Sequence, residues 1–149
     1  MNRRMKMILF PGIILGVSLF SYLLVQSTRK AEAAEMTQPS KLLVVWTSGD
    51  RDVALKMVFM YTYNAKKNKW WDEVKLVVWG PSSKLLSDDQ ELQDYIKKMK
   101  DEGVILEACK ACSDMYGVSD KLSSLGIDVK YMGKPLTEML KTGWVSLTF

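Results

Sequence analysis

Short apolar runs alternate with stretches of helical periodicity over residues 41–149 of the 149-residue chain. Each run is continuous and is bounded by Gly, Pro or polar residues, which is typical of strands buried on both faces of a sheet. The runs KLLVVWT and EVKLVVW are the clearest examples. The pattern predicts five strands, at residues 41–47, 73–79, 104–108, 127–132 and 144–149.

The segments between the predicted strands carry apolar residues at helical spacing. A helix over 52–67 would place Met57 and Met60 on its core side, and Ser87 would cap a helix over 88–102. The GPSS stretch at 80–83 is predicted to end the second strand as a loop. Further helices are predicted over 110–116, after Ser119, and over 136–141 behind Pro135.

Strands that alternate with helices of this length predict βαβ units, and therefore a parallel sheet covered by helices on both faces in three α/β/α layers. In such sheets, ligands and catalytic groups gather beyond the carboxyl ends of the strands. The loops expected at that edge are residues 47–50, 80–83, 109–112 and 133–135. Asp50 and Ser82 in these loops are substrate-site candidates, although Asp50 is more simply interpreted as a helix cap and Ser82 as a turn residue.

Cys109 and Cys112 are the only cysteines, and they lie where the third strand passes into a helix. Backbone N–H groups at a helix start favour an anion, and Lys110 adds a positive charge nearby, so we expect the pKa of the Cys109 thiol to be lowered. The pair has four interpretations. It is buried and inert, it holds a soft metal such as Cu(I), it cycles as a dithiol and a disulfide, or one nucleophilic cysteine carries sulfur while the other resolves it.

Composition removes several other functions. The chain contains no histidine, which excludes His-based metal sites, a Ser-His-Asp triad and a Cys-His dyad. The five basic residues and single acid of residues 1–33 account for the whole net charge of +4, so no basic stripe is left to bind nucleic acid.

The first 33 residues read as a targeting segment. Basic residues precede an uncharged apolar run over 8–25, and a small-x-small site follows at 31–33. This order predicts a signal peptide or an uncleaved N-terminal membrane anchor, with a linker over 34–40 and one domain over 41–149. We therefore expect an exported protein, periplasmic or attached through residues 8–25 to the outer face of the cytoplasmic membrane.

Two stretches resemble the DsrE/DsrF family of small sulfur-relay proteins. One is the Gly103-Val104 segment that leads to Cys109, with Gly117 eight residues later, and the other is LGIDVKYMGKPLTEMLKTGWVSLTF at 125–149. The resemblance covers nearly all of 41–149. It implies a doubly wound, five-stranded α/β/α domain without a cofactor, assembled into trimers or hexamers.

The resemblance also implies a chemistry. The sulfur-accepting cysteine of the family falls on Cys109, which would carry a persulfide as a sulfur carrier or sulfurtransferase. Cys112 departs from the family pattern, and from the residues themselves we expect it to act as the resolving thiol. Its partners would be sulfur-donor and sulfur-acceptor proteins or small sulfur species. The alternatives are a non-catalytic oligomeric binding module, in which Cys109 and Cys112 hold a soft metal, and a periplasmic dithiol/disulfide oxidoreductase.

Overall fold

The computed structural model describes residues 22, 25–26 and 39–149. Residues Pro39–Phe149 form one compact unit. Most of the predicted targeting segment and most of the predicted linker lie outside the described residues. Within the described part of the chain, no helix combines the length and apolar character that crossing a bilayer requires.

Five parallel strands form a single sheet in the order β4-β3-β2-β1-β5. All five lie within two or three residues of their predicted positions, and the predicted parallel sheet is confirmed. The strands are β1 (Lys41–Trp46), β2 (Glu73–Val78), β3 (Ile105–Cys109), β4 (Asp128–Lys130) and β5 (Val145–Thr148).

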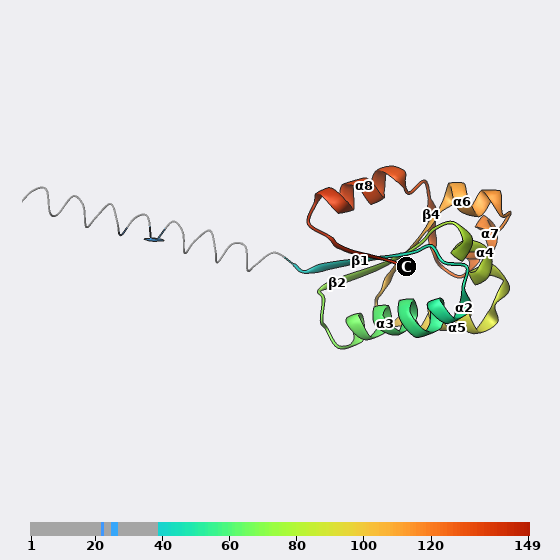
Figure 1. The fold of residues 1–149 in the computed structure, drawn as a ribbon, viewed down its shortest axis with the longest axis horizontal. Coiled ribbons are helices and arrows are strands. Elements are labelled where there is room, and N and C mark those ends of the chain that lie inside the picture. Colours follow the sequence, from blue (N-terminus) through green and yellow to red (C-terminus); the bar gives the residue numbers. More distant parts are fainter. Residues whose placement is uncertain (1–21, 23–24, 27–38) are drawn as a thin grey trace, which may run out of the picture. The chain divides into compact units, whose positions relative to one another are not determined.

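Helices cover both faces of the sheet, which gives the three-layer α/β/α architecture (Figure 1). The elements α3 and α5 lie on one side of the sheet and α8 lies on the other. The chain adds β2, β3 and β4 outward from β1 and then returns to place β5 beside β1, so the fold is doubly wound. The helices are α2 (Arg51–Val53), the π-helix η1 (Ala54–Phe59), α3 (Met60–Lys67), α4 (Pro81–Asp88), α5 (Gln90–Asp101), α6 (Lys110–Met115), α7 (Ser119–Ser124) and α8 (Gly133–Lys141).

Alternate residues of the strands belong to two different apolar clusters, because successive side chains of a strand point to opposite faces of the sheet. Leu42, Val44 and Trp46 of β1 belong to the larger cluster, which includes residues of η1, α5 and α7. Leu43 and Val45 belong to the smaller cluster, where Met139 of α8 and Cys109 also pack. Cys109 therefore faces the layer that α8 covers.

The prediction that Met57 and Met60 face the core is wrong. Their side chains are 48% and 52% exposed, whereas Val58 and Phe59 are fully buried. The helical run contains the π-helical segment η1, and its wider turn shifts the phase of the residues that follow. A strict 3.6-residue period therefore selects the wrong face.

The region from 80 to 89 also differs from the prediction. Residues 81–83 begin α4 instead of forming a loop, with Pro81 in the first turn, where its missing N–H costs nothing. The cap of α5 is Asp89 rather than Ser87, because the Asp89 carboxylate accepts the N–H of Leu92 at 3.1 Å. The last predicted helix begins at Gly133, two residues before Pro135.

Candidate functional site

The carboxyl ends of the parallel strands bring three segments together at one edge of the sheet. Gly80 follows β2, and both cysteines follow or end β3. Gly49, in the loop after β1, approaches the start of α4 so closely that an added Cβ would lie 3.3 Å from Cβ of Pro81. The predicted gathering of these loops at the carboxyl edge is thus observed for the first three strands.

Cys109 and Cys112 lie in contact at this edge as free thiols. Cys109 ends β3 and occupies the residue before the first turn of α6, and it is only 4% exposed. Cys112 lies one turn further on and is half-buried against the same apolar cluster. One sulfur is therefore shielded by the fold while the other reaches partly into solvent.

The pKa of the Cys112 thiol is raised, first by burial and then by its contact with Cys109. A hydrogen bond from the backbone N–H of Gly80 opposes this shift but does not outweigh it. Cys112 therefore remains a neutral thiol at neutral pH, and it can donate its S–H to a negatively charged sulfur beside it.

Ser82 holds the β2–α4 turn against the end of β1. Its buried hydroxyl donates to the carbonyl oxygen of Trp46 at 2.6 Å and accepts the N–H of Trp79 at 3.0 Å. Gly80 precedes it with φ of 71°, a backbone conformation that favours glycine. Ser82 thus lies under the site and fixes the turn that presents the Gly80 N–H to Cys112.

Asp50 is the cap of α2, as the simpler interpretation predicted. Its carboxylate accepts the N–H groups of Asp52 at 2.8 Å and Val53 at 3.1 Å. Its position in the exposed β1–α2 loop places it at the carboxyl edge of the sheet.

The charge of Lys110 is engaged by its own helix. Its ammonium lies 2.9 Å and 2.8 Å from the two carboxylate oxygens of Asp114, which raises the pKa of Lys110 and lowers that of Asp114. Both residues line a hollow of about 240 Å³ together with Ser119. Lys110 is adjacent to Cys109 in sequence, but its charge is balanced on a neighbouring part of the surface.

The structure adds Lys130 and Glu107, which sequence reasoning missed. Lys130 of β4 is the register partner of Cys109, and partners in a parallel pair point to the same face. Oε1 of Glu107, two residues before Cys109, accepts from Lys130 at 2.9 Å and from Lys75 of β2 at 2.7 Å. The sequence offers one sign of this cluster, the single acid Glu107 inside an apolar strand. It does not show that the strands carrying Lys75 and Lys130 are the neighbours of that strand.

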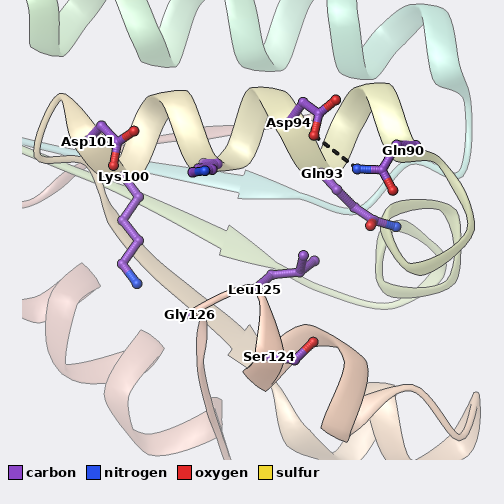
Figure 2. Close-up of a pocket in the computed structure, with 9 residues that line it drawn as sticks. Gln90, Gln93, Asp94, Lys100, Asp101, Ser124, Leu125 and Gly126 are labelled. Atoms are coloured by element: carbon purple, nitrogen blue, oxygen red, sulfur yellow. Dashed lines mark hydrogen bonds between the residues drawn. The ribbon is translucent and has the colours of Figure 1, made fainter.

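The surface of the domain has two further hollows. One of about 330 Å³ lies between Gly49, the exposed side of α4 and Tyr116, one turn beyond Cys112. A larger one of about 500 Å³ lies between α5 and residues 124–126 (Figure 2). Polar side chains line the larger hollow, including Gln90 hydrogen-bonded to Asp94, and neither cysteine reaches it. Neither cysteine lines the smaller hollow, although Tyr116 in its wall lies four residues after Cys112.

The described residues contain no group of three or more Cys, Asp or Glu side chains placed to hold a metal ion. The two sulfurs provide two donors, fewer than the four of a structural zinc site.

Comparisons with known proteins agree with the fold. A solved structure of a conserved protein of unknown function, BT1422 from Bacteroides thetaiotaomicron, is similar, with a TM-score of 0.72 and 39% sequence identity. The similarity covers 74% of this chain and 95% of that one. A search of curated proteins finds no match. The model of the DsrE/DsrF-like family matches residues 40–149, and the chain therefore belongs to that family.

Proposed function

We propose that this protein carries sulfane sulfur as a persulfide on Cys109 and that Cys112 resolves it. The observation that carries the proposal is the contact between two free thiols at the carboxyl edge, one of which stays protonated. Membership of the DsrE/DsrF-like family supports a sulfur-relay role in general terms.

Loading needs a nucleophilic sulfur and a stabilised anion. The Cys109 thiolate attacks the outer sulfur of a donor persulfide R–S–SH, the donor S–S bond breaks, and RS⁻ leaves with Cys109–S–SH formed. The neutral Cys112 thiol, which lies in contact with Cys109, donates its S–H to the anion in this step. Lys130, the register partner of Cys109, is ion-paired with both Glu107 and Asp128, so its charge is balanced as that of Lys110 is.

The outer sulfur can leave Cys109 by two routes, and only the second oxidises the two cysteines. An acceptor nucleophile that attacks the outer sulfur takes it and restores the Cys109 thiolate. Alternatively, Cys112 loses its proton and attacks the inner sulfur, so that H₂S leaves and a Cys109–Cys112 disulfide forms. That disulfide then requires two electrons and two protons from an external dithiol before another cycle.

The high pKa of Cys112 favours the first route. A protonated thiol is a poor nucleophile, so the persulfide survives long enough to meet an acceptor. Cys112 then acts as a slow resolving group that discharges sulfur when no acceptor arrives.

The test is the intact mass of the purified protein after exposure to a polysulfide. We expect a reductant-sensitive gain of about 32 Da per sulfur in the parent, none in Cys109→Ser, and a longer-lived gain in Cys112→Ser. The variant without either cysteine is the matched control, because the chain then has no thiol.

Each other outcome argues against sulfur carriage on Cys109. If Cys109→Ser loads as well as the parent, the assignment of the two roles is wrong. A loss of two hydrogens in the parent, together with no sulfur gained in Cys112→Ser, supports a dithiol/disulfide oxidoreductase, because Cys112→Ser cannot discharge a persulfide as a disulfide. An unchanged mass supports the binding module, and metal analysis of protein purified without reductant then decides whether the thiols hold a soft metal.

The same proposal includes a location and an assembly. We infer that the chain acts outside the cytoplasm, at the outer face of the cytoplasmic membrane, because an uncharged run over 8–25 follows a basic start. A trimeric or hexameric assembly is tested by sedimentation velocity, in which a species of monomer mass only would contradict it.

A further inference from the structure

We propose that the edge of the domain opposite the cysteines is a contact surface for an anionic phospholipid bilayer. The surface, called here the entry patch, consists of exposed Trp70, its ring neighbour Tyr61, and the lysines Lys66, Lys67 and Lys69. The inference concerns docking and is independent of the thiol chemistry.

The chain enters the domain beside this patch. Ser40, just before β1, donates its backbone N–H and its hydroxyl to the Asp72 carboxylate at 2.7 Å and 2.9 Å. Asp72 lies two residues after Trp70 in the turn that leads into β2. The first described residues of the domain are thus fixed to the turn that carries the tryptophan.

The length of chain outside the domain favours a bilayer as the occupant. Thirteen residues, 26–38, separate the apolar run 8–25 from Pro39. Fully extended they reach about 45 Å. If the apolar run stays in the membrane, as an uncleaved anchor would, the entry patch remains within that distance of the bilayer surface.

The composition of the patch fits the interface of a membrane. Trp70 is 57% exposed, and tryptophan is enriched at the headgroup level because its ring is apolar while its N–H is polar. Lys67 and Lys69 are exposed beside it, and Lys66 is partly exposed, with its ammonium bound to the Asp72 carbonyl at 2.9 Å. Lysines at a bilayer surface are attracted by anionic headgroups.

The acids in this region reduce its charge but do not cancel it. Asp72 and Glu102 share a hollow with the three lysines. Lys98 of α5 adds a further cation, since its ammonium lies over the ring of Tyr63, as does that of Lys67. Within the hollow, three lysines against two acids leave a net charge of +1 next to the exposed tryptophan.

The topology gives this docking a consequence for the thiols. All five strands are parallel, so the β2 start beside Trp70 and the β3 end at Cys109 lie at opposite edges of the sheet. A bilayer held at the entry patch therefore leaves Cys109 and Cys112 facing away from the membrane, where donor and acceptor proteins reach them.

The domain alone provides the direct test. Residues Pro39–Phe149 are a compact unit, and a match over 74% of this chain covers 95% of a solved chain, so we expect the domain to fold without the preceding segment. We expect this domain to sediment with vesicles of phosphatidylglycerol and phosphatidylcholine, and to stay in solution with phosphatidylcholine alone. Salt should weaken the binding, because the headgroup attraction is screened.

Two variants and two matched controls locate the contact. Trp70→Ala and Lys67→Gln/Lys69→Gln should each lower vesicle partitioning about tenfold. Met115→Ser removes an apolar side chain that is 86% exposed near the cysteines, and Lys121→Gln/Lys134→Gln removes the same charge elsewhere. Both controls should bind like the parent, and circular dichroism checks that every variant is folded.

Several results would overturn the inference. They are an absence of sedimentation with anionic vesicles, equal binding to both vesicle types, or an equal loss of binding in the control variants. If Trp70→Ala instead dissolves a self-associated species in sedimentation velocity, the patch is an interface between copies. For the full chain in nanodiscs, hydrogen exchange at 66–72 should slow in anionic lipid relative to zwitterionic lipid, and unchanged exchange would contradict the docking.

Discussion

Replacing Glu107 with Gln tests the buried charge cluster beside Cys109. The Glu107 side chain is 6% exposed, and its Oε1 forms ion pairs with the ammonium groups of Lys75 and Lys130. The side chains of these lysines are 14% and 37% exposed. Its Oε2 is buried without a hydrogen-bond partner. Glutamine keeps the shape but removes the negative charge that compensates two ammonium groups.

The expected loss of stability is about 3 kcal/mol, because removing one partner leaves Lys75 as an uncompensated and largely buried cation. Lys130 contributes less, since it also binds Asp128 at 2.7 Å and is more exposed. The amide N–H₂ placed at the Oε2 position adds a buried donor without an acceptor. For a domain of this size the loss corresponds to a fall in Tm of roughly 10 °C or more.

The assay is urea unfolding of the parent, Glu107→Gln, Lys75→Met and the Glu107→Met/Lys75→Met double variant. The double variant should be more stable than Glu107→Gln, because it removes the charge and its uncompensated partner together. The reasoning would be refuted if Glu107→Gln lowers the free energy of unfolding by less than about 1 kcal/mol while the m-value, the change of that free energy with urea concentration, is unchanged. It would mean that Lys75 reaches solvent when its partner is lost.

Three further outcomes are expected from the site and its supports. Ser82→Ala should cost about 1 kcal/mol in urea unfolding, because it removes the hydrogen bonds of a buried hydroxyl while the Trp79 N–H keeps its own bond to the Trp46 carbonyl at 2.9 Å, and sulfur loading should persist. The pKa of Asp89 is lowered, chiefly by Arg51, so its carboxylate stabilises the fold above its ordinary value of 3.8. That contribution is lost as pH falls through the lower folded value, and Asp89→Asn should show a flatter acid dependence of the urea midpoint. Lys110→Met should change the rate of sulfur loading by less than about threefold, since Asp114 already balances the ammonium. A larger fall in the rate would mean that the Lys110 charge acts on Cys109.

Local pattern predicted elements well where one interaction dominates. The apolar run of β1 admits no other arrangement than a strand buried on both faces, and it is buried from Leu42 to Trp46. Asp50 was recognised as a cap because a short acceptor before a helix binds the free N–H groups of its own first turn. Contacts of this kind join residues that are close in sequence, so they can be predicted from the sequence.

Local pattern failed where competing local choices have similar free energies. Ser87 and Asp89 are both good caps, and the choice of Asp89 adds an ion pair with Arg51 from a distant helix. Met57 and Met60 fit a core-facing period, and only packing against the sheet selects the π-helical turn that exposes them. Tertiary contacts decide such cases.

Alternation and run length are properties of the chain, so they are enough to place Cys109 and Cys112 where a buried strand ends at the carboxyl edge of a parallel sheet. The surroundings of the two thiols depend on the packed fold. The Gly80 N–H at Cys112, Lys130 in register with Cys109, and Glu107 between two lysines all depend on the order β4-β3-β2-β1-β5. Strand order is set by the free energy of the whole packed sheet, and no single segment of the chain encodes it.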